Sequence, residues 1–350
     1  MAVRKLSEGV AGSTPAAPPK REKRSLDAEL SRAARALDEA GTVALACHVN
    51  PDPDAIGSML GLAAFLESKG KQVVCSWGNQ PMTRPRWLSL VDGARFLVEP
   101  KDFPAAPELM MALDTAALDR LGLLAANAER AAEVIVLDHH RTNPGFGSIV
   151  VIDPDASSTA EMAFRLVERM GGELPDQAAA WLYAGIITDT GRFQYEAATS
   201  ETLRVAAELR RRRFDHVRMG QVLFEDGSFG YLQVLGVALG RVSLVPEADL
   251  VWTYLLQSDL RGSVTMGDVD DLIDLIRTAR EADVACVLKQ QRDGQFKVSL
   301  RSKGATDVGA AALSFGGGGH RLASGYTVAS GVEGAVASLV EALERVRQEA

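Results

Sequence analysis

The amino-acid sequence predicts an α/β protein of two domains, the first built on a parallel sheet. Three observations support this fold class. Short apolar runs alternate with helical patterns over the first part of the chain, which is typical of βαβ units. The length of 350 residues exceeds what one typical core accommodates. From about residue 241 the strand-like alternation becomes denser, which predicts a second, smaller α/β domain.

The first domain is expected over residues 26–195. Its predicted strands are the apolar runs TVALACHV (42–49), QVVCSW (72–77), LMMALD (109–114) and EVIVLD (133–138). Its predicted helices are SLDAELSRAARALDEAG (25–41), AIGSMLGLAAFLESKG (55–70) and DQAAAWLYAGIITDTGRFQY (176–195), the last ending near Asp189. Because helices separate the strands, the sheet is expected to be parallel.

The rest of the chain divides into a connector and the second domain. Residues 196–240 predict a partly helical connector, and residues 241–350 the smaller α/β domain. The predicted strands lie in 242–256, 283–302 and 325–330, and the predicted helices in 268–280 and 332–348. Asp293-Gly294 is the type of dipeptide that forms a tight hairpin turn.

Composition excludes several classes of protein. The formal net charge of −8 disfavours binding of long duplex DNA, which relies on neutralised phosphates. No apolar stretch is long enough to span a bilayer. Residues 1–25 lack the apolar core of a signal peptide and are expected to form a disordered basic tail. The three cysteines lie far apart in apolar runs, which indicates reduced core thiols and a cytoplasmic location.

Acidic and histidine side chains follow three of the predicted strands. His48 follows the first strand, Asp114 the third, and Asp138-His139-His140 the fourth. Ligands of parallel α/β sheets bind beyond the carboxyl ends of the strands. The sequence therefore predicts a functional site at this edge of the sheet.

The residues at this edge are suited to a divalent metal ion. Imidazole and carboxylate ligands without thiolate favour Mn²⁺ or a similar ion over structural zinc. Four crowded aspartates carry a formal charge of −4, which two divalent ions would cancel. Two such ions about 3.5–4 Å apart can stabilise the attacking and leaving oxygens of a phosphate ester. The six predicted ligands are His48, Asp52, Asp54, Asp114, His139 and Asp189.

Each of these signals also has a structural interpretation. Taken alone, NPDPD at 50–54 is typical of a turn before a capped helix, and the histidines at 139–140 are compatible with a loop. The serines and threonine at 157–159 favour a helix N-cap over a place in the site. The arginines at 210–213 and His216 are expected on the surface. The metal site is predicted from the joint pattern rather than from any one motif.

With these residues assembled, the chain resembles the DHH-family phosphoesterases, named for the Asp-His-His at 138–140. The resemblance covers roughly residues 28–345. It rests on HVNPDPDAIGS (48–58), LDTA (113–116), DHH, ITDTGRF (187–193), SLRSKG (299–304) and GGGGHRLASG (316–325). The resemblance implies a Rossmann-like DHH catalytic domain, a DHH-associated substrate-binding domain at residues 241–350, and an active-site cleft between them.

The family pattern also implies a role for each matching residue. The implied ligand sets are His48 and Asp52 with a bridging Asp114, and Asp54, His139 and Asp189 around the second ion. The implied cofactor is two Mn²⁺ ions, for which Mg²⁺ or Co²⁺ can substitute. Asp138 would support the site by orienting an imidazole, and His140 would face the substrate phosphate. Asp114, Asp138 and His140 are therefore the expected catalytic residues.

The second domain carries the expected substrate contacts. A glycine run by itself indicates a flexible loop, but it also lets backbone amides approach a phosphate or a base. Arginine has a planar guanidinium that suits phosphate. The substrate-binding residues that the resemblance implies are Arg301, Ser302, Lys303, Gly317, Gly318, Gly319 and His320. Arg192 is a further candidate for a phosphate contact, because it lies three residues past Asp189.

Among DHH-type activities, the chain resembles most the small bacterial enzymes that degrade short oligoribonucleotides (nano-RNA) and 3′-phosphoadenosine 5′-phosphate (pAp). Inorganic pyrophosphatases have a different C-terminal domain, long single-strand exonucleases are larger, and membrane phosphodiesterases have transmembrane segments. The expected reaction is in-line attack by a metal-bridging hydroxide. The expected substrates are short RNA, pAp and pApA, with a homodimer as the expected assembly. Two alternatives stay open: a cyclic di-AMP phosphodiesterase, and a nucleotide-binding sensor without catalysis.

Overall fold

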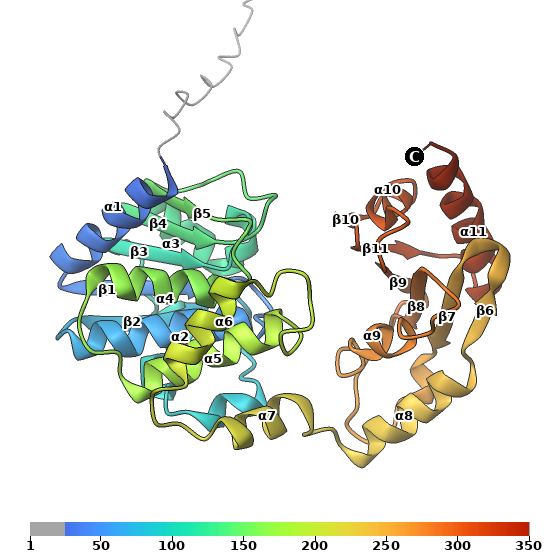
Figure 1. Ribbon diagram of the computed structural model, residues 1–350, viewed down its shortest axis with the longest axis horizontal. Helices are drawn as coiled ribbons and strands as arrows, with labels where there is room; N and C mark the ends of the chain where they lie inside the picture. The colour runs from blue at the N-terminus through green and yellow to red at the C-terminus, as the bar shows by residue number, and fades with distance from the viewer. Residues whose placement is uncertain (1–24, 350) are drawn as a thin grey trace, which may run out of the picture. The chain divides into compact units, whose positions relative to one another are not determined.

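The computed structural model describes residues 25–349 in two compact units, which are treated separately below (Figure 1). Unit 1 ends at Leu223 and unit 2 begins at Phe224. The basic tail predicted for residues 1–25 lies outside the described residues except for Ser25. The boundary falls inside the predicted connector, at the end of helix α7 (His216–Phe224).

Unit 1 is built on a parallel five-stranded sheet with the strand order β2-β1-β3-β4-β5. The strands are β1 (Thr42–Cys47), β2 (Gln72–Trp77), β3 (Leu109–Leu113), β4 (Glu133–Asp138) and β5 (Ile149–Ile152). The four predicted strands and their parallel pairing are confirmed, and β5 is an edge strand that the sequence did not predict. Because β2 and β3 flank β1 on opposite sides, the chain reverses direction across the sheet at β1, the usual position of a ligand site.

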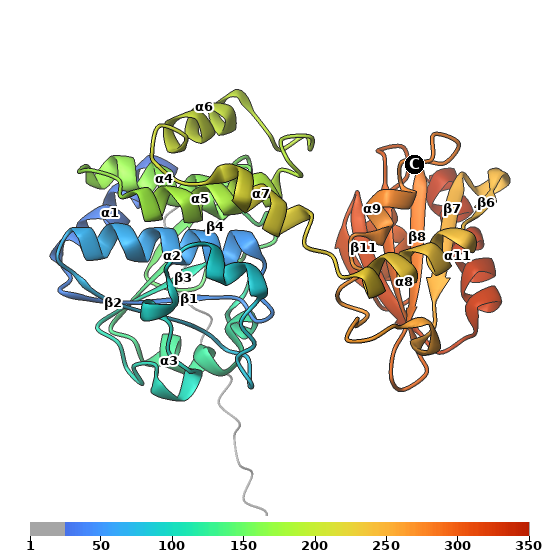
Figure 2. The same ribbon diagram turned by 90° about the horizontal axis from the view of Figure 1, so that it is seen from below.

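Helices cover both faces of this sheet, as Figure 2 shows. The helices are α1 (Leu26–Glu39), α2 (Pro53–Ser68), α3 (Ala125–Arg130), α4 (Thr159–Met170), α5 (Asp176–Asp189) and α6 (Ser200–Leu209), together with α7. Alternate residues of the strands face the two layers, since successive side chains of a strand point to opposite sides. Leu45 belongs to the core beneath α1, α2, α4 and α5, while Ala44 and Ala46 belong to the smaller core beneath α3.

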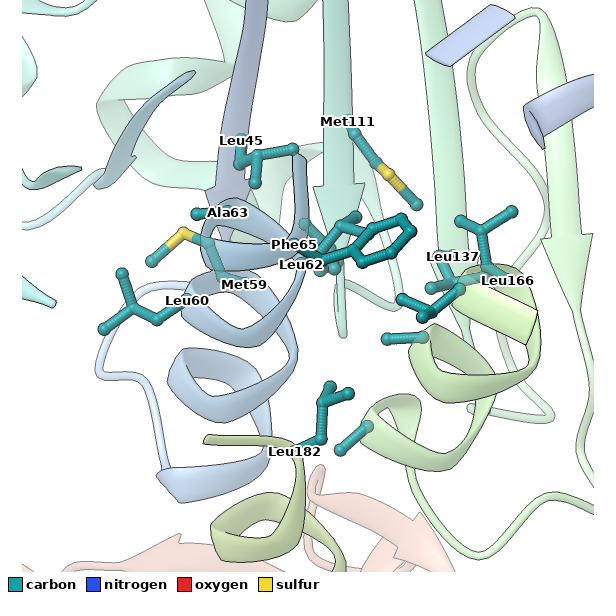
Figure 3. Close-up of a cluster of buried hydrophobic side chains, with 14 of the residues drawn as sticks. Leu45, Met59, Leu60, Leu62, Ala63, Phe65, Met111, Leu137, Leu166 and Leu182 are labelled. Carbon is teal, nitrogen blue, oxygen red and sulfur yellow. The ribbon is translucent and has the colours of Figure 1, made fainter. Parts of the chain in front are cut away.

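The larger core is formed by α2 against the strands and the neighbouring helices, as seen in Figure 3. Phe65 of α2 lies among Leu45, Met111 and Leu137, which come from β1, β3 and β4. All four of these side chains are fully buried. Burying one such side chain contributes on the order of 1.5–3 kcal/mol, so this layer holds α2 firmly against the sheet.

Helices α2 and α5 approach one another closely because glycines line their contact. A Cβ atom at Gly57 would lie 2.5 Å from the carbonyl oxygen of Trp181, and one at Gly185 would lie 2.7 Å from a carboxylate oxygen of Asp54. Neither position has room for a side chain. This close packing brings the start of α2 next to α5, whose end carries Asp189.

Unit 2 contains a six-stranded mixed sheet with the order β10-β11-β9-β8-β7-β6. The strands are β6 (Ser243–Val245), β7 (Leu250–Leu255), β8 (Val284–Gln290), β9 (Phe296–Ser302), β10 (Gly318–His320) and β11 (Ala323–Val328). One face packs against α10 (Val308–Leu313) and α11 (Val332–Glu349), the other against α8 (Phe229–Gly240) and α9 (Leu272–Ile276). The hairpin at Asp293-Gly294 is confirmed, with Gly294 at φ +88°.

Two predictions from the sequence change in detail. The helix expected over 268–280 is limited to α9, which has five residues. The glycine run at 316–319 is partly a strand, because β10 pairs with β11 through Gly318, Gly319 and His320. All three cysteines are free and buried, as expected of core thiols. Over residues 25–349, no helix combines the length and the apolar character needed to cross a bilayer.

Candidate metal centre

The predicted ligands meet at the carboxyl edge of the sheet in unit 1. His48 directly follows β1, Asp114 directly follows β3, and His139 directly follows β4. These three strands are neighbours in the sheet, so the three side chains start from adjacent positions. The other ligands come from helix ends: Asp52 and Asp54 from the start of α2, and Asp189 from the end of α5.

Asp52 combines a structural role with a free carboxylate oxygen. It is the N-cap of α2, and its Oδ1 accepts hydrogen bonds of 3.0 Å from the backbone N–H groups of Asp54 and Ala55. Pro53 occupies the first helical position, where its missing N–H has no cost. The second oxygen, Oδ2, lies 3.9 Å from Nε2 of His48. NPDPD therefore serves as a helix cap and places a carboxylate oxygen in the candidate metal site at the same time.

His48 is held in one tautomer by its own loop. Its Nδ1 lies 2.8 Å from the carbonyl oxygen of Val49, which can only accept a hydrogen bond, so Nδ1 carries the proton. In the neutral form the lone pair is on Nε2, which lies 3.5 Å from Oδ2 of Asp114. In the metal-free protein, burial lowers the pKa of His48, but the hydrogen bond and the charge of Asp114 raise it overall, and the protonated Nε2 then donates to Asp114. A neutral imidazole oriented by a backbone carbonyl is the usual form of a metal ligand.

Asp114 lies at the centre of the site and is shared by its two halves. The side chain is almost fully buried, and its oxygens lie 3.5 Å from Nε2 of His48 and 3.7 Å from Nε2 of His139. Ligand atoms of His48, Asp52 and Asp114 lie within 4.8 Å of one another. Asp114 therefore lies between the imidazoles of the two halves of the site.

The second half of the site contains Asp54, His139 and Asp189. Their ligand atoms also lie within 4.8 Å of one another, and Nε2 of His139 is 3.5 Å from Oδ2 of Asp189. The buried carboxylate of Asp54 accepts hydrogen bonds of 2.7 and 2.9 Å from the backbone N–H groups of Thr159 and Ala160, at the start of α4. The positive end of a helix dipole thus faces a ligand that has little access to solvent.

The crowded carboxylates disturb one another's protonation in the metal-free protein. Burial, with repulsion from Asp114 and Asp189, raises the pKa of Asp54 well above its usual value. Burial also raises the pKa of Asp189, to about 7, although the charge of His139 opposes this shift. Burial would raise the pKa of Asp114 too, but the hydrogen bond to His48 and the three nearby imidazoles lower it overall. A site that holds this much negative charge is suited to cations.

His140 is oriented by Asp138 and is placed differently from His139. Its Nδ1 lies 2.7 Å from Oδ1 of Asp138, and this hydrogen bond raises the pKa of His140 to about 9. Asp138 is completely buried, and its other oxygen accepts a 2.6 Å hydrogen bond from the side-chain amide of Asn143. Asn143 also donates to the carbonyl oxygen of Thr115. Asn143 was missed from the sequence, where nothing marks a single asparagine in a loop as a partner of Asp138.

Thr159 contacts the centre of the site as well as starting α4. Its hydroxyl donates a 2.9 Å hydrogen bond to Oδ1 of Asp114, while Ser158 is the N-cap of the helix. The sequence favoured a helix N-cap for residues 157–159. In the structure this segment both caps α4 and contacts Asp114. The buried carboxylate of Glu161 holds this segment in place, since it accepts hydrogen bonds from the hydroxyls of Ser157 and Thr202.

Unusual backbone conformations concentrate around the site. Among the described residues other than glycine, five have positive φ angles, and four of them lie in loops of this site: Asn50, Asp114, Arg192 and Phe193. Strained backbone of this kind costs on the order of 1–3 kcal/mol per residue and persists where the surroundings enforce it. Arg192, an expected substrate-binding residue, therefore extends from a left-handed turn directly after Asp189.

The predicted substrate-binding residues of unit 2 divide into two groups. Arg301 of β9 pairs in register with Ala323 of β11, which pairs with His320 of β10. Directly opposite residues point to the same face of a sheet, so Arg301 and His320 lie on one face, about 10 Å apart.

Ser302 is buried on the opposite face, and its hydroxyl donates to Asp283. The exposed Lys303 donates from Nζ to the carbonyl oxygen of Ala279.

The three predicted glycines are also distinct from one another. A Cβ atom at Gly317 would lie 2.3 Å from the carbonyl oxygen of Gly325, and Gly319 has φ +143° with Ser324 within 2.5 Å of the same position. Both positions therefore need glycine for the pairing of β10 with β11. At Gly318 no atom lies within 4 Å of the Cβ position, so packing does not require a glycine there.

The donor set fits hard or intermediate divalent cations. It consists of imidazole nitrogens and carboxylate oxygens, with no thiolate among the ligand atoms of the described residues. Such sets suit Mn²⁺, Mg²⁺ or similar ions. The two triads have no residue in common, but they are adjacent, because Asp114 of the first lies 3.7 Å from Nε2 of His139 in the second.

Comparison with known proteins places this arrangement in context. A family model described as the DHH family N-terminal domain matches residues 42–186, and one for the DHHA1 domain matches residues 252–349. The chain is 34% identical to a bifunctional oligoribonuclease and PAP phosphatase NrnA of Thermus thermophilus, over 88% of this chain and 89% of that protein. It is 29% identical to the Bacillus subtilis protein of that name, over 83% and 90%.

A solved structure has the same fold over most of the chain. The crystal structure of an exopolyphosphatase-related protein from Bacteroides fragilis matches with a TM-score of 0.85 and 27% identity. The match covers 92% of this chain and 97% of that one. Both the sequence and the fold of the chain therefore agree with the family that its motifs resemble.

Proposed function

Since the chain belongs to the DHH family of phosphoesterases, we propose that it hydrolyses short oligoribonucleotides to mononucleotides and pAp to AMP, using two Mn²⁺ ions. The short substrates include the dinucleotide pApA. The observation that carries the proposal is the pair of ligand triads, His48, Asp52 and Asp114 on one side and Asp54, His139 and Asp189 on the other. The names of the relatives supply the substrate class.

When bound, two divalent ions supply a strong nucleophile from water at neutral pH and offset charge on the phosphoryl oxygens. The residues of the chain perform the remaining tasks. Asp114 fixes the spacing of the two halves of the site, and Asp138 holds the imidazole of His140 with its Nε2 directed away from the carboxylate. A protonated His140 would donate a hydrogen bond to a phosphoryl oxygen and stabilise its developing charge.

The face of unit 2 that carries Arg301 and His320 is proposed to bind the substrate. Arg301 supplies a planar guanidinium, and the open Cβ position of Gly318 leaves its backbone accessible to a ligand. Ser302 and Lys303 already contact Asp283 and Ala279, so their proposed contribution is to hold the end of β9 in place. Arg192 is proposed to contact phosphate from unit 1.

The alternatives predict different outcomes of one assay. A pyrophosphatase would need no base-bearing substrate, a cyclic di-AMP phosphodiesterase would prefer the cyclic dinucleotide, and a sensor would bind nucleotide without turnover. The relatives named as oligoribonucleases and PAP phosphatases favour a nucleotide substrate. The homodimer and the cytoplasmic location stay predictions.

The test is a hydrolysis panel with purified full-length protein. The substrates are pAp, pApA, a pentameric RNA, a long RNA strand, cyclic di-AMP and pyrophosphate, each with Mn²⁺, Mg²⁺, Co²⁺ or a chelator. The proposal predicts rapid loss of pAp and the shortest RNAs with Mn²⁺ and none with the chelator. R301A should raise KM by roughly 10–100-fold, the effect of one lost charged hydrogen bond. Pyrophosphate as the preferred substrate, or no turnover at all, would contradict the proposal.

A further inference from the structure

A small cavity of about 260 Å³ opens beside the metal centre in unit 1. It is lined by Asn50, Pro51, Trp77, Asn79, Thr83 and Pro85. Asn50 and Pro51 belong to the loop between the ligands His48 and Asp52. Trp77 ends β2, and it pairs in register with Cys47, the residue before His48. The cavity therefore adjoins the metal centre through one continuous loop and one neighbouring strand.

Two asparagine side chains fix the shape of this cavity. The side-chain amide of Asn79 donates a 2.8 Å hydrogen bond to Oδ1 of Asn50, and the backbone N–H of Asn50 donates one of 2.6 Å to Oδ1 of Asn79. Asn50 has φ +54°, a conformation that asparagine adopts more readily than most residues. The two carboxamides thus hold one another, and the loop, in a single orientation.

Several polar groups of the lining stay available to a ligand. Within residues 25–349, the side-chain nitrogen Nδ2 of Asn50 and the hydroxyl of Thr83 make no hydrogen bond to the protein. Both residues are exposed, so these groups face solvent at the cavity. The amide donates, and the hydroxyl both donates and accepts. A ligand that offers acceptors at its edge can therefore bind both.

The lining contains no charged side chain, which decides the class of ligand. Phosphate would bind where cations or arginine lie, and none of the six lining residues is charged. The half-buried rings of Pro51 and Pro85 provide apolar surface, while the amides and the hydroxyl provide polar contacts at the edge; Trp77 is fully buried behind this lining. The volume lies below the range of about 300–1,000 Å³ typical of pockets for drug-sized ligands, so it suits one heterocycle rather than a dinucleotide.

We propose that this cavity binds the nucleobase of the nucleotide whose phosphate lies at the metal centre. The inference rests on the proposed function and adds to it a site in unit 1 that recognises the base. Nucleobases are flat, uncharged and rich in edge acceptors, as the lining requires. Because every base offers such acceptors, the site would favour nucleotides over other phosphate esters without selecting one sequence.

The test compares ligands with and without a base. Binding of AMP and of ribose 5-phosphate to the Mn²⁺-loaded protein is measured by calorimetry. AMP should bind at least about tenfold more tightly, as the added contacts of a base would give. N50G keeps a residue suited to φ +54°, and T83V keeps the shape of the side chain; both should lose most of the preference for AMP. Q72A, an exposed residue at the other end of β2, is the matched control and should retain the preference.

The outcomes separate this inference from the proposed function. Equal binding of AMP and ribose 5-phosphate by the wild type overturns the base site, as does an unchanged preference in both N50G and T83V. Hydrolysis of pAp is measured on the same samples. If pAp is hydrolysed but AMP has no advantage, the base site falls and the proposed function stands. If AMP is preferred but pAp is not hydrolysed, the proposed function falls and the base site stands.

Discussion

The Nδ1 atom of His140 lies 2.7 Å from Oδ1 of Asp138, a carboxylate with no exposure to solvent. Asn143 occupies the other oxygen of the same carboxylate. One buried acid therefore sets both the orientation of the imidazole and, through its charge, the pKa of His140. His139, the preceding residue, instead directs Nε2 toward Asp114 and Asp189. The adjacent histidines thus differ in their partners, although a ring nitrogen of each lies within 4 Å of Asp114.

Replacing Asp138 by asparagine should affect His140 without emptying the metal site. In D138N the pKa of His140 should fall from about 9 toward its usual value of 6.5, because the negative partner is lost. Hydrolysis of pAp should fall by about 10–100-fold, as for other residues that orient an active-site group. The pKa is read from an NMR titration of the metal-free protein. D155N, an exposed aspartate with only a surface ion pair, is the control; a D138N protein with wild-type turnover would contradict this role.

Thr159 is expected to position Asp114 for metal binding. T159V keeps the shape of the side chain but removes the 2.9 Å hydrogen bond to Asp114, so Mn²⁺ affinity should fall by about 10–100-fold. T159S restores a hydroxyl and should restore most of the affinity. Mn²⁺ binding is followed by calorimetry and electron paramagnetic resonance, independently of turnover. If T159V and T159S bind Mn²⁺ equally well, the hydroxyl has no positioning role.

The contact between α2 and α5 should tolerate no side chain at Gly57. In G57A the new methyl group would meet the backbone of Trp181 and Gly185, so unfolding free energy should fall by about 1–3 kcal/mol or more. G220A is the matched control: Gly220 lies in α7 with no atom near its Cβ position. G220A should raise stability by about 0.5–1 kcal/mol. Both values come from urea unfolding of the metal-free protein, and equal effects of the two substitutions would refute the packing argument.

The metal-free protein should lose stability as pH rises, because of Asp189. Burial raises the pKa of Asp189 from 3.8 to about 7, so between these values the folded state binds a proton that the unfolded state releases. Stability from this group is complete below about pH 4 and is lost as pH rises through 7. D189N has no such charge. Its melting temperature should match that of the wild type near pH 4 and exceed it by a few degrees at pH 8; a constant difference would show that Asp189 is not the cause.

The strands that carry the site could be predicted because their signals are local. TVALAC and EVIVLD are apolar runs of strand length, and His48 and Asp114 follow directly where such runs end. The end of α5 at Asp189 was likewise predicted. In a parallel sheet these ends meet at one edge, so the site followed from the order of elements alone.

The partners of these residues could not be predicted because they are distant in the sequence. Thr159 contacts Asp114 across 45 residues, and the carboxylate of Asp54 meets the start of α4 across 105 residues. A capping pattern explains the serines and threonine at 157–159 equally well without such a contact. Strand β5 is an apolar run of only four residues, at the lower limit of strand length, and β10 consists of two glycines and a histidine, which carry no strand signal.

The most direct test of the central claim is a titration of the metal-free protein with Mn²⁺, in which bound ions and pAp hydrolysis are measured on the same samples. We expect two Mn²⁺ ions to bind per chain, and hydrolysis to appear only as the ions bind. D114N, which removes the charge between His48 and His139, should lose tight binding and fall to background hydrolysis. D119N, an exposed aspartate five residues further along the chain, should behave as the wild type. One ion per chain at full activity, or hydrolysis that survives removal of the metal, would contradict the two-metal centre.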